Sequence, residues 1–138
     1  MADPSPVHPF STVVLRHEES DGGHHFDWLI ATDAAGELPL AAVRCPRRPD
    51  REGWEGMRVH AASEHRPRYL WFEGPLSGDR GIVERVAEGC VERWARGADR
   101  WELEVRWSCG KRVEFTIAFA GSTGILHNTG KAAEKGVS

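Results

Sequence analysis

The residues best suited to chemistry in this sequence are a histidine and an aspartate two positions apart, His25 and Asp27, in the run HHFDWLI at His24–Ile30. Apolar residues alternate with them, as in a half-buried β-strand, so the imidazole and the carboxylate are expected on the same face. His17 lies eight residues upstream of His25, across a turn-like segment, and is a candidate third ligand. Three protein ligands with open coordination positions are typical of a catalytic metal site.

A second polar group follows in the middle of the chain. His65, Arg66, Arg68 and Tyr69 fall within five residues, ahead of an aromatic run and a glycine-punctuated segment. Guanidinium groups and an imidazole suit phosphate oxygens, and a tyrosine hydroxyl adds a further hydrogen bond. This cluster predicts a phosphate-binding site.

Short strands must position these residues. Strands are predicted at 11–16, 24–31, 38–44, 57–61, 69–72, 81–86, 90–94, 100–107 and 112–119. The last two form the clearest hairpin, because apolar and polar residues alternate strictly on both sides of a short turn at 108–111. Segments 81–86 and 90–94 predict another hairpin around a Glu88-Gly89 turn, although 83–95 also fits helical spacing moderately well. Roughly eight to ten short strands predict an all-β, mainly antiparallel domain, either a barrel or a sandwich.

Length and composition restrict the organisation and the class of protein. The 138 residues predict one domain at 10–127, with a flexible N-terminal arm at 1–9 and a flexible tail at 128–138. An apolar share of 40% with six tryptophans and five phenylalanines supports a core. The net charge of −3 gives no global attraction to nucleic acid, so any such binding must use a local patch.

The cellular setting is predicted from cysteine usage and from the N-terminal residues. Three widely separated cysteines, with no CxxC pair, indicate reduced thiols rather than a disulfide framework. No signal peptide is evident, and no apolar stretch is long enough to span a membrane. These features predict a cytoplasmic protein without a membrane partner.

Taken in order, the polar clusters resemble the phosphoesterase domain of the bacterial DNA ligase D family, a module that heals 3′ ends. That family carries a histidine, a short loop, and then His-Tyr-Asp-Phe-Arg on a strand. Its later motif is His-Pro-x-x-Tyr, followed shortly by Phe-Glu-Gly. His17 and the run 25–27 match the first part, and His65, Tyr69 and the run 72–74 match the second. The similarity begins near residue 10 and ends near residue 94.

The resemblance implies a β-barrel-like fold and a divalent metal, with manganese expected first and zinc, cobalt or magnesium as alternatives. It implies removal of a 3′-terminal ribonucleoside or phosphate from DNA ends in repair, with a nucleic-acid 3′ end and DNA-repair proteins as partners. By the same resemblance, His17, His25 and Asp27 would hold the metal, and His65 and Tyr69 would contact the scissile phosphate.

The sequence departs from the family pattern at three places. The spacing from His17 to His25 is two residues longer, Arg66 replaces the proline after the later histidine, and Leu29 replaces an arginine that clamps the phosphate. The arginines that could take over phosphate binding are Arg58, Arg66, Arg68 and Arg80. Because of Leu29, two alternatives stay open: a non-catalytic module that binds a metal or nucleic acid, and a phosphoesterase for small molecules.

A basic loop offers one more candidate surface. Arg47, Arg48 and Arg51 predict a solvated loop, with a nucleic-acid backbone contact as the alternative. Most of the tryptophans are expected in the core. Trp54, in the basic loop, is the one tryptophan predicted to stack on a base.

Overall fold

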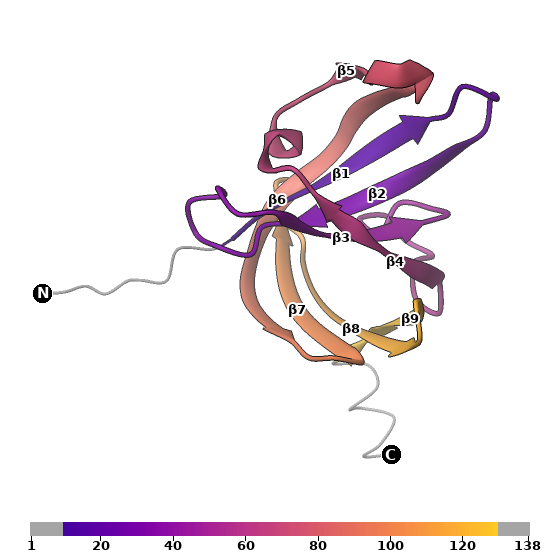
Figure 1. Ribbon diagram of the computed structural model, residues 1–138. Helices are drawn as coiled ribbons and strands as arrows, with labels where there is room; N and C mark the ends of the chain where they lie inside the picture. The colour runs from indigo at the N-terminus through magenta and orange to yellow at the C-terminus, as the bar shows by residue number, and fades with distance from the viewer. Residues whose placement is uncertain (1–9, 130–138) are drawn as a thin grey trace, which may run out of the picture.

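Alternation of apolar and polar side chains along the chain produces strands connected mostly by tight turns. The structure is a computed structural model, and it describes residues 10–129 (Figure 1). The strands are β1 (Phe10–Glu18), β2 (His24–Ile30), β3 (Leu40–Cys45), β4 (Arg58–His65), β5 (Gly74–Pro75), β6 (Ile82–Arg96), β7 (Arg100–Trp107), β8 (Arg112–Ala120) and β9 (Thr123–Asn128). Two short 3₁₀ helices are η1 (Pro67–Leu70) and η2 (Ser77–Asp79).

The strands form one antiparallel sheet that closes on itself. The order is β1-β2-β3-β4-β9-β8-β7-β6, and β6 pairs again with β1. The result is a closed eight-stranded barrel in one domain, with the two-residue β5 added beside β6. The predicted all-β barrel is therefore confirmed, and closure leaves no long unpaired edge among these eight strands.

The barrel interior is filled by aromatic and branched side chains from every one of the eight strands. Trp28 packs edge-on against Phe115, with ring centroids 4.9 Å apart, and Trp54 lies 4.5 Å from the same ring. The indole of Trp28 donates a hydrogen bond to Thr12 Oγ1 at 2.9 Å, and that hydroxyl donates to the Leu29 carbonyl at 2.7 Å. The interior is thus a packed core with its buried polar atoms paired at this point.

A second apolar cluster lies outside the barrel, on the outer faces of β1, β2, β3 and β6. Its buried residues include Leu15, Leu29, Leu40 and Val83. The segment 66–81, which contains η1, β5 and η2, covers this cluster (Figure 1) and packs aromatic and leucine side chains against it. The barrel wall is therefore apolar on both sides here, and the covering segment is held beside β1 and β2.

Two predicted elements in the middle of the chain are wrong. Residues 69–72 are not a strand: Pro67 at the first helical position starts η1, and the amides of Trp71 and Phe72 both donate to the Arg68 carbonyl. The predicted hairpin at 81–86 and 90–94, and the helical alternative for 83–95, are replaced by the single long strand β6. Gly89 lies inside that strand and is not a turn residue. The position requires glycine because a Cβ there would be 2.4 Å from the Arg106 carbonyl oxygen.

The other boundaries differ less. The strand β9 was not predicted at all, since Gly124 interrupts its alternation. The predicted tail begins at Asn128, which is instead the last residue of β9. The predicted arm at 1–9 and residues 130–138 of the predicted tail lie outside the described residues. The three cysteines are free thiols. Among residues 10–129, no helix has the length and apolar character needed to cross a membrane.

Candidate metal and phosphate site

Strand pairing places the three predicted ligands together. His17 on β1 stands directly opposite His25 on β2, and Asp27 follows two residues later on the same face. His25 Nε2 lies 3.1 Å from Asp27 Oδ1, and His17 Nδ1 lies 3.6 Å from Asp27 Oδ2. One ligand atom from each residue can be chosen so that all three lie within 4.8 Å of one another. Two atoms bound to one ion at about 2.1 Å lie roughly 3–3.5 Å apart, so the separation between His25 and Asp27 suits a shared ion, and the separation between His17 and Asp27 is slightly longer.

Each histidine of this group is held through one ring nitrogen. His25 Nδ1 is 2.9 Å from Glu19 Oε2, and His17 Nε2 is 2.7 Å from the Arg80 carbonyl oxygen. The other nitrogen of His25, Nε2, is buried and lacks a hydrogen-bond partner among the described residues, although Asp27 Oδ1 is close. A buried nitrogen without a hydrogen bond, facing a carboxylate and a second imidazole, is the arrangement expected of a metal ligand.

The electrostatics of the group favour a buried negative charge next to the imidazoles. Burial would raise the pKa of the Asp27 carboxyl, but contact with His25, together with His65 and His17, lowers the pKa below its usual value. The Asp27 carboxylate in turn raises the pKa of His25, against the opposing effects of burial and of Arg44. Asp27 is therefore ionised at neutral pH and available to a cation.

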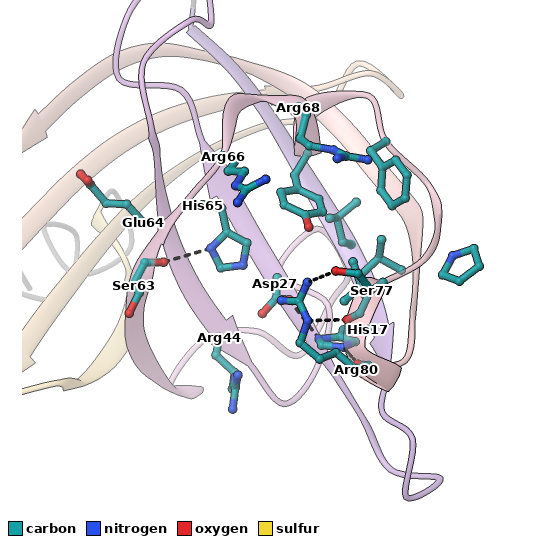
Figure 2. Close-up of a pocket in the computed structure, with 16 residues that line it drawn as sticks. His17, Asp27, Arg44, Ser63, Glu64, His65, Arg66, Arg68, Ser77 and Arg80 are labelled. Carbon is teal, nitrogen blue, oxygen red and sulfur yellow. Dashed lines mark hydrogen bonds and ion pairs between the residues drawn. The ribbon is translucent and has the colours of Figure 1, made fainter.

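A cavity of about 590 Å³ opens directly beside these ligands. His17 and Asp27 line it, and so do five residues of the second sequence cluster and its surroundings: His65, Arg66, Arg68, Tyr69 and Arg80. Figure 2 shows His65, Arg66 and Arg80 around Asp27. The fold thus brings the two clusters, which are separated by about forty residues of sequence, into one site.

The end of β4 and the helix η1 place His65 and Tyr69. His65 Nδ1 is 2.9 Å from the Ser63 carbonyl oxygen, which can only accept, so Nδ1 carries the proton. The rings of His65 and Tyr69 meet edge to face with centroids 5.8 Å apart. Both residues line the cavity, and the turn at Pro67 lies between them.

The arginines differ in how they reach the cavity. Arg80 is fixed by bonds from Nε to the Ser77 carbonyl (2.8 Å) and from Nη2 to Ser77 Oγ (3.2 Å). Arg68 stacks over the Phe72 ring at 4.3 Å. Arg58 begins β4 at its pairing with β9 and is not among the residues that line the cavity, so the structure does not bring this predicted residue into the site.

Sequence reasoning missed Arg44, which lines the cavity from β3. It stands directly across the strand pair from Asp27 and makes no ion pair with another described residue. No motif marks it, because its position depends on the register between β2 and β3. The one available signal was that Arg44 is the single charged residue in the apolar strand 40–45.

Leu29 occupies the place of the arginine in the family pattern. It is fully buried in the apolar cluster outside the barrel, with Leu15, Leu40 and Val83 in the same cluster. The side chain at this strand position is therefore packed among apolar residues. A positively charged side chain for the phosphate must come from another strand.

Two of the three arginines of the basic loop bond to acceptors of the protein itself, and the third, Arg51, is exposed. Arg48 donates to Asp50 and to the Val86 carbonyl, each at 2.8 Å, and Arg47 donates to the Gly53 carbonyl at 2.9 Å. Trp54 is only 7% exposed and packs in the core, so the prediction that it stacks on a base is wrong. The tryptophan that is largely exposed is Trp71, at 69%.

No protein-family model matches the chain, and a search of curated proteins finds no match either. The likeness to the ligase D phosphoesterase domain therefore rests on the quoted motifs.

Proposed function

We propose that this protein is a metal-dependent phosphoesterase that acts on nucleic-acid 3′ ends and removes a terminal ribonucleoside or phosphate during DNA repair. The observation that carries the proposal is the shared cavity. His17 and Asp27 line one wall of it, with His25 beside them in the same cluster, and a histidine, a tyrosine and four arginines line the rest of the polar surface. Such a site would hold a metal ion next to the phosphate group that the ion activates.

The residues present fit a divalent ion. Two imidazole nitrogens and a carboxylate suit Mn²⁺ or Zn²⁺ better than ions that prefer all-oxygen ligands, and Mn²⁺ is proposed first. The unpartnered Nε2 of His25 supports this fit, because a buried ring nitrogen normally has a hydrogen bond. An ion held there polarises a phosphate oxygen and lowers the pKa of water.

The arginines supply the binding of the phosphate group. Arg44, Arg66, Arg68 and Arg80 all line the cavity, where guanidinium groups donate paired hydrogen bonds to phosphate oxygens. Arg80 is pre-oriented by Ser77, so little conformational freedom is lost when it binds. Arg44 takes the role that Leu29 cannot fill, since it faces the cavity beside Asp27.

His65 and Tyr69 act on the bridging oxygen. Because His65 donates from Nδ1 to the Ser63 carbonyl, its Nε2 is available to hold or release a proton at the leaving oxygen. The Tyr69 hydroxyl orients the same group by a hydrogen bond. Both residues line the cavity on the wall formed by β4 and η1.

A second candidate is a phosphoesterase for small molecules. The observation that favours it is that two of the loop arginines, Arg47 and Arg48, are engaged with acceptors of the protein itself, which leaves the cationic groups concentrated in the cavity. A small phosphoester needs only that cavity, whereas a polymer needs further contacts along its backbone.

The test uses a labelled DNA primer that ends in a 3′ ribonucleotide or a 3′ phosphate. We expect release of the terminal ribonucleoside or phosphate when Mn²⁺ is added, and loss of release in Asp27→Asn. A folded sample that shows no metal-stimulated release with Mn²⁺, Mg²⁺, Co²⁺ or Zn²⁺ contradicts the enzyme proposal. Competition by single-stranded DNA against a chromogenic phosphoester separates the two substrate classes: inhibition supports the nucleic-acid end, and its absence supports the small molecule.

A further inference from the structure

The hydrogen bonds around the two histidines determine which nitrogen of each ring carries a proton. A backbone carbonyl can only accept, so His17 must donate from Nε2 to Arg80, and its Nδ1 is left with a lone pair. An ionised glutamate also only accepts, so His25 donates from Nδ1 to Glu19, and the neutral form of the His25 ring then has its lone pair on Nε2. These two free nitrogens are the ones that face Asp27, at 3.6 Å and 3.1 Å.

Glu19 is held in place by the turn between β1 and β2. Its amide donates to the Gly23 carbonyl at 2.7 Å, and its carbonyl accepts from the Gly22 amide at 3.0 Å. Asp21 Oδ1 accepts from the Gly23 amide and tightens the same turn. The Glu19 side chain is 43% exposed while that of His25 is 9% exposed, so the carboxylate reaches a buried ring from the solvent side.

We propose that Glu19 is a positioning residue for the metal, which holds His25 with its proton on Nδ1 so that Nε2 is presented to a divalent cation beside Asp27. The inference rests on the proposed metal site. It assigns a role to the turn that is two residues longer than in the family pattern, because Glu19 lies in that turn. A carboxylate on the far nitrogen also makes an imidazole a stronger ligand.

The adjacent residue Glu18 provides a matched control. It comes from the same end of β1 and carries the same charge, but its carboxylate pairs with Arg16 Nη1 at 3.3 Å and does not contact His25. Replacing either glutamate by alanine changes the charge near the site by the same amount. Only replacement of Glu19 removes the acceptor from His25 Nδ1.

The experiment titrates the metal-free full chain with Mn²⁺ alone and follows binding by calorimetry. Outer hydrogen bonds to metal-bound histidines typically contribute about 10- to 100-fold in affinity, so we expect a loss of that size in Glu19→Ala. Glu19→Gln keeps an oxygen that can accept from Nδ1 but lacks the charge, and we expect a smaller loss. Glu18→Ala is expected to bind within about twofold of the unmodified chain, since it leaves both histidines as they are.

A second measurement does not need the metal. Nitrogen-15 NMR of the metal-free protein, at a pH where imidazoles are neutral, distinguishes the two tautomers of His25. We expect the Nδ1-protonated form in the unmodified chain and in Glu18→Ala, and a mixture in Glu19→Ala. Equal Mn²⁺ affinity and an unchanged tautomer in Glu19→Ala would overturn the role of Glu19 alone. An unmodified chain that binds no Mn²⁺ would instead overturn the proposed function.

Discussion

At the scale of single residues, the candidate site is built around the buried carboxylate of Asp27. This carboxylate lies next to the imidazoles of His17 and His25, beside a cavity that four arginines line. The sequence predicted the three ligands because their spacing along two adjacent strands carries the geometry. It did not predict Arg44 or Glu19, since the first requires the register of β3 and the second requires the path of a turn. Local patterns determine which face a side chain takes, but not which residue lies opposite it.

Arg44 is expected to be the main phosphate ligand near Asp27. Arg44→Gln removes a charged donor from the cavity, and loss of such a donor typically lowers the rate by about 10²-fold or more. Arg58→Gln is the matched control, because Arg58 lies outside the lining of the cavity. Steady-state release of the 3′ phosphate checks both variants. If Arg58→Gln loses activity and Arg44→Gln keeps it, the assignment of Arg44 is wrong.

Leu29 is expected to tolerate arginine poorly. The side chain is fully buried among apolar residues of β1, β3 and β6, so Leu29→Arg places a charge where it has no partner. The free energy of unfolding should fall by about 3 kcal/mol or more, without a gain in activity. Urea denaturation measures the free energy of unfolding, and release of the 3′ phosphate from the labelled primer measures the activity. A stable variant with strongly raised activity would instead support a decayed active site.

At the scale of elements, the covering segment 66–81 connects the arginine-lined cavity with the proposed metal ligands. Arg80 lines the cavity with its side chain and accepts from His17 with its carbonyl. Residues 69–72 of this segment were predicted as a strand because aromatic residues dominate them, whereas Pro67 starts a 3₁₀ helix there. The misassigned hairpin has a similar cause, since a glycine inside a long strand resembles a turn in the sequence.

Gly81 is the residue that lets the covering segment approach β1. A Cβ at this position would lie 2.0 Å from the Glu18 carbonyl oxygen, and the backbone φ of +100° already disfavours other residues. Gly81→Ala should lower the free energy of unfolding and also weaken Mn²⁺ binding, because the Arg80 carbonyl moves away from His17. Denaturation and calorimetric titration measure these effects.

The control for that variant is Gly53→Ala. Gly53 has a similar φ of +92°, but no atom lies within 4 Å of the added Cβ. This variant should show only the backbone strain, of about 1 kcal/mol, and unchanged Mn²⁺ affinity. Equal affinity in both variants would show that the close approach of Gly81 does not position His17.

At the scale of the whole molecule, the packed core and the candidate site lie on opposite faces of the same strands. Interior residues of β1, β2 and β3 belong to the packed core, while the alternate residues carry the ligands and the outer apolar cluster. The all-β fold class was predictable from strand alternation. That alternation left both a barrel and a sandwich open, because closure depends on the pairing of β1 with β6, and the resemblance implied the barrel. The net charge gave no indication of an arginine-lined cavity, since acidic residues elsewhere offset it.

This separation predicts that damage to the core leaves the ligands intact. Thr12→Val removes the hydroxyl that accepts from Trp28, which leaves the buried indole N–H of Trp28 without its acceptor. The free energy of unfolding should fall by about 1–3 kcal/mol for this unpaired group. Mn²⁺ affinity, measured below the unfolding temperature, should stay the same. A parallel loss of affinity would show that the core and the site are coupled.

The most direct test of the central claim is a calorimetric Mn²⁺ titration of the metal-free chain, its Asp27→Ala variant and its Glu37→Ala variant. Glu37 has an exposed side chain in the β2–β3 loop and is not part of the proposed ligand set. The proposal predicts one bound ion in the unmodified chain and in Glu37→Ala, and none in Asp27→Ala. Mn²⁺ uptake that is absent from the unmodified chain, or equal in all three proteins, contradicts it.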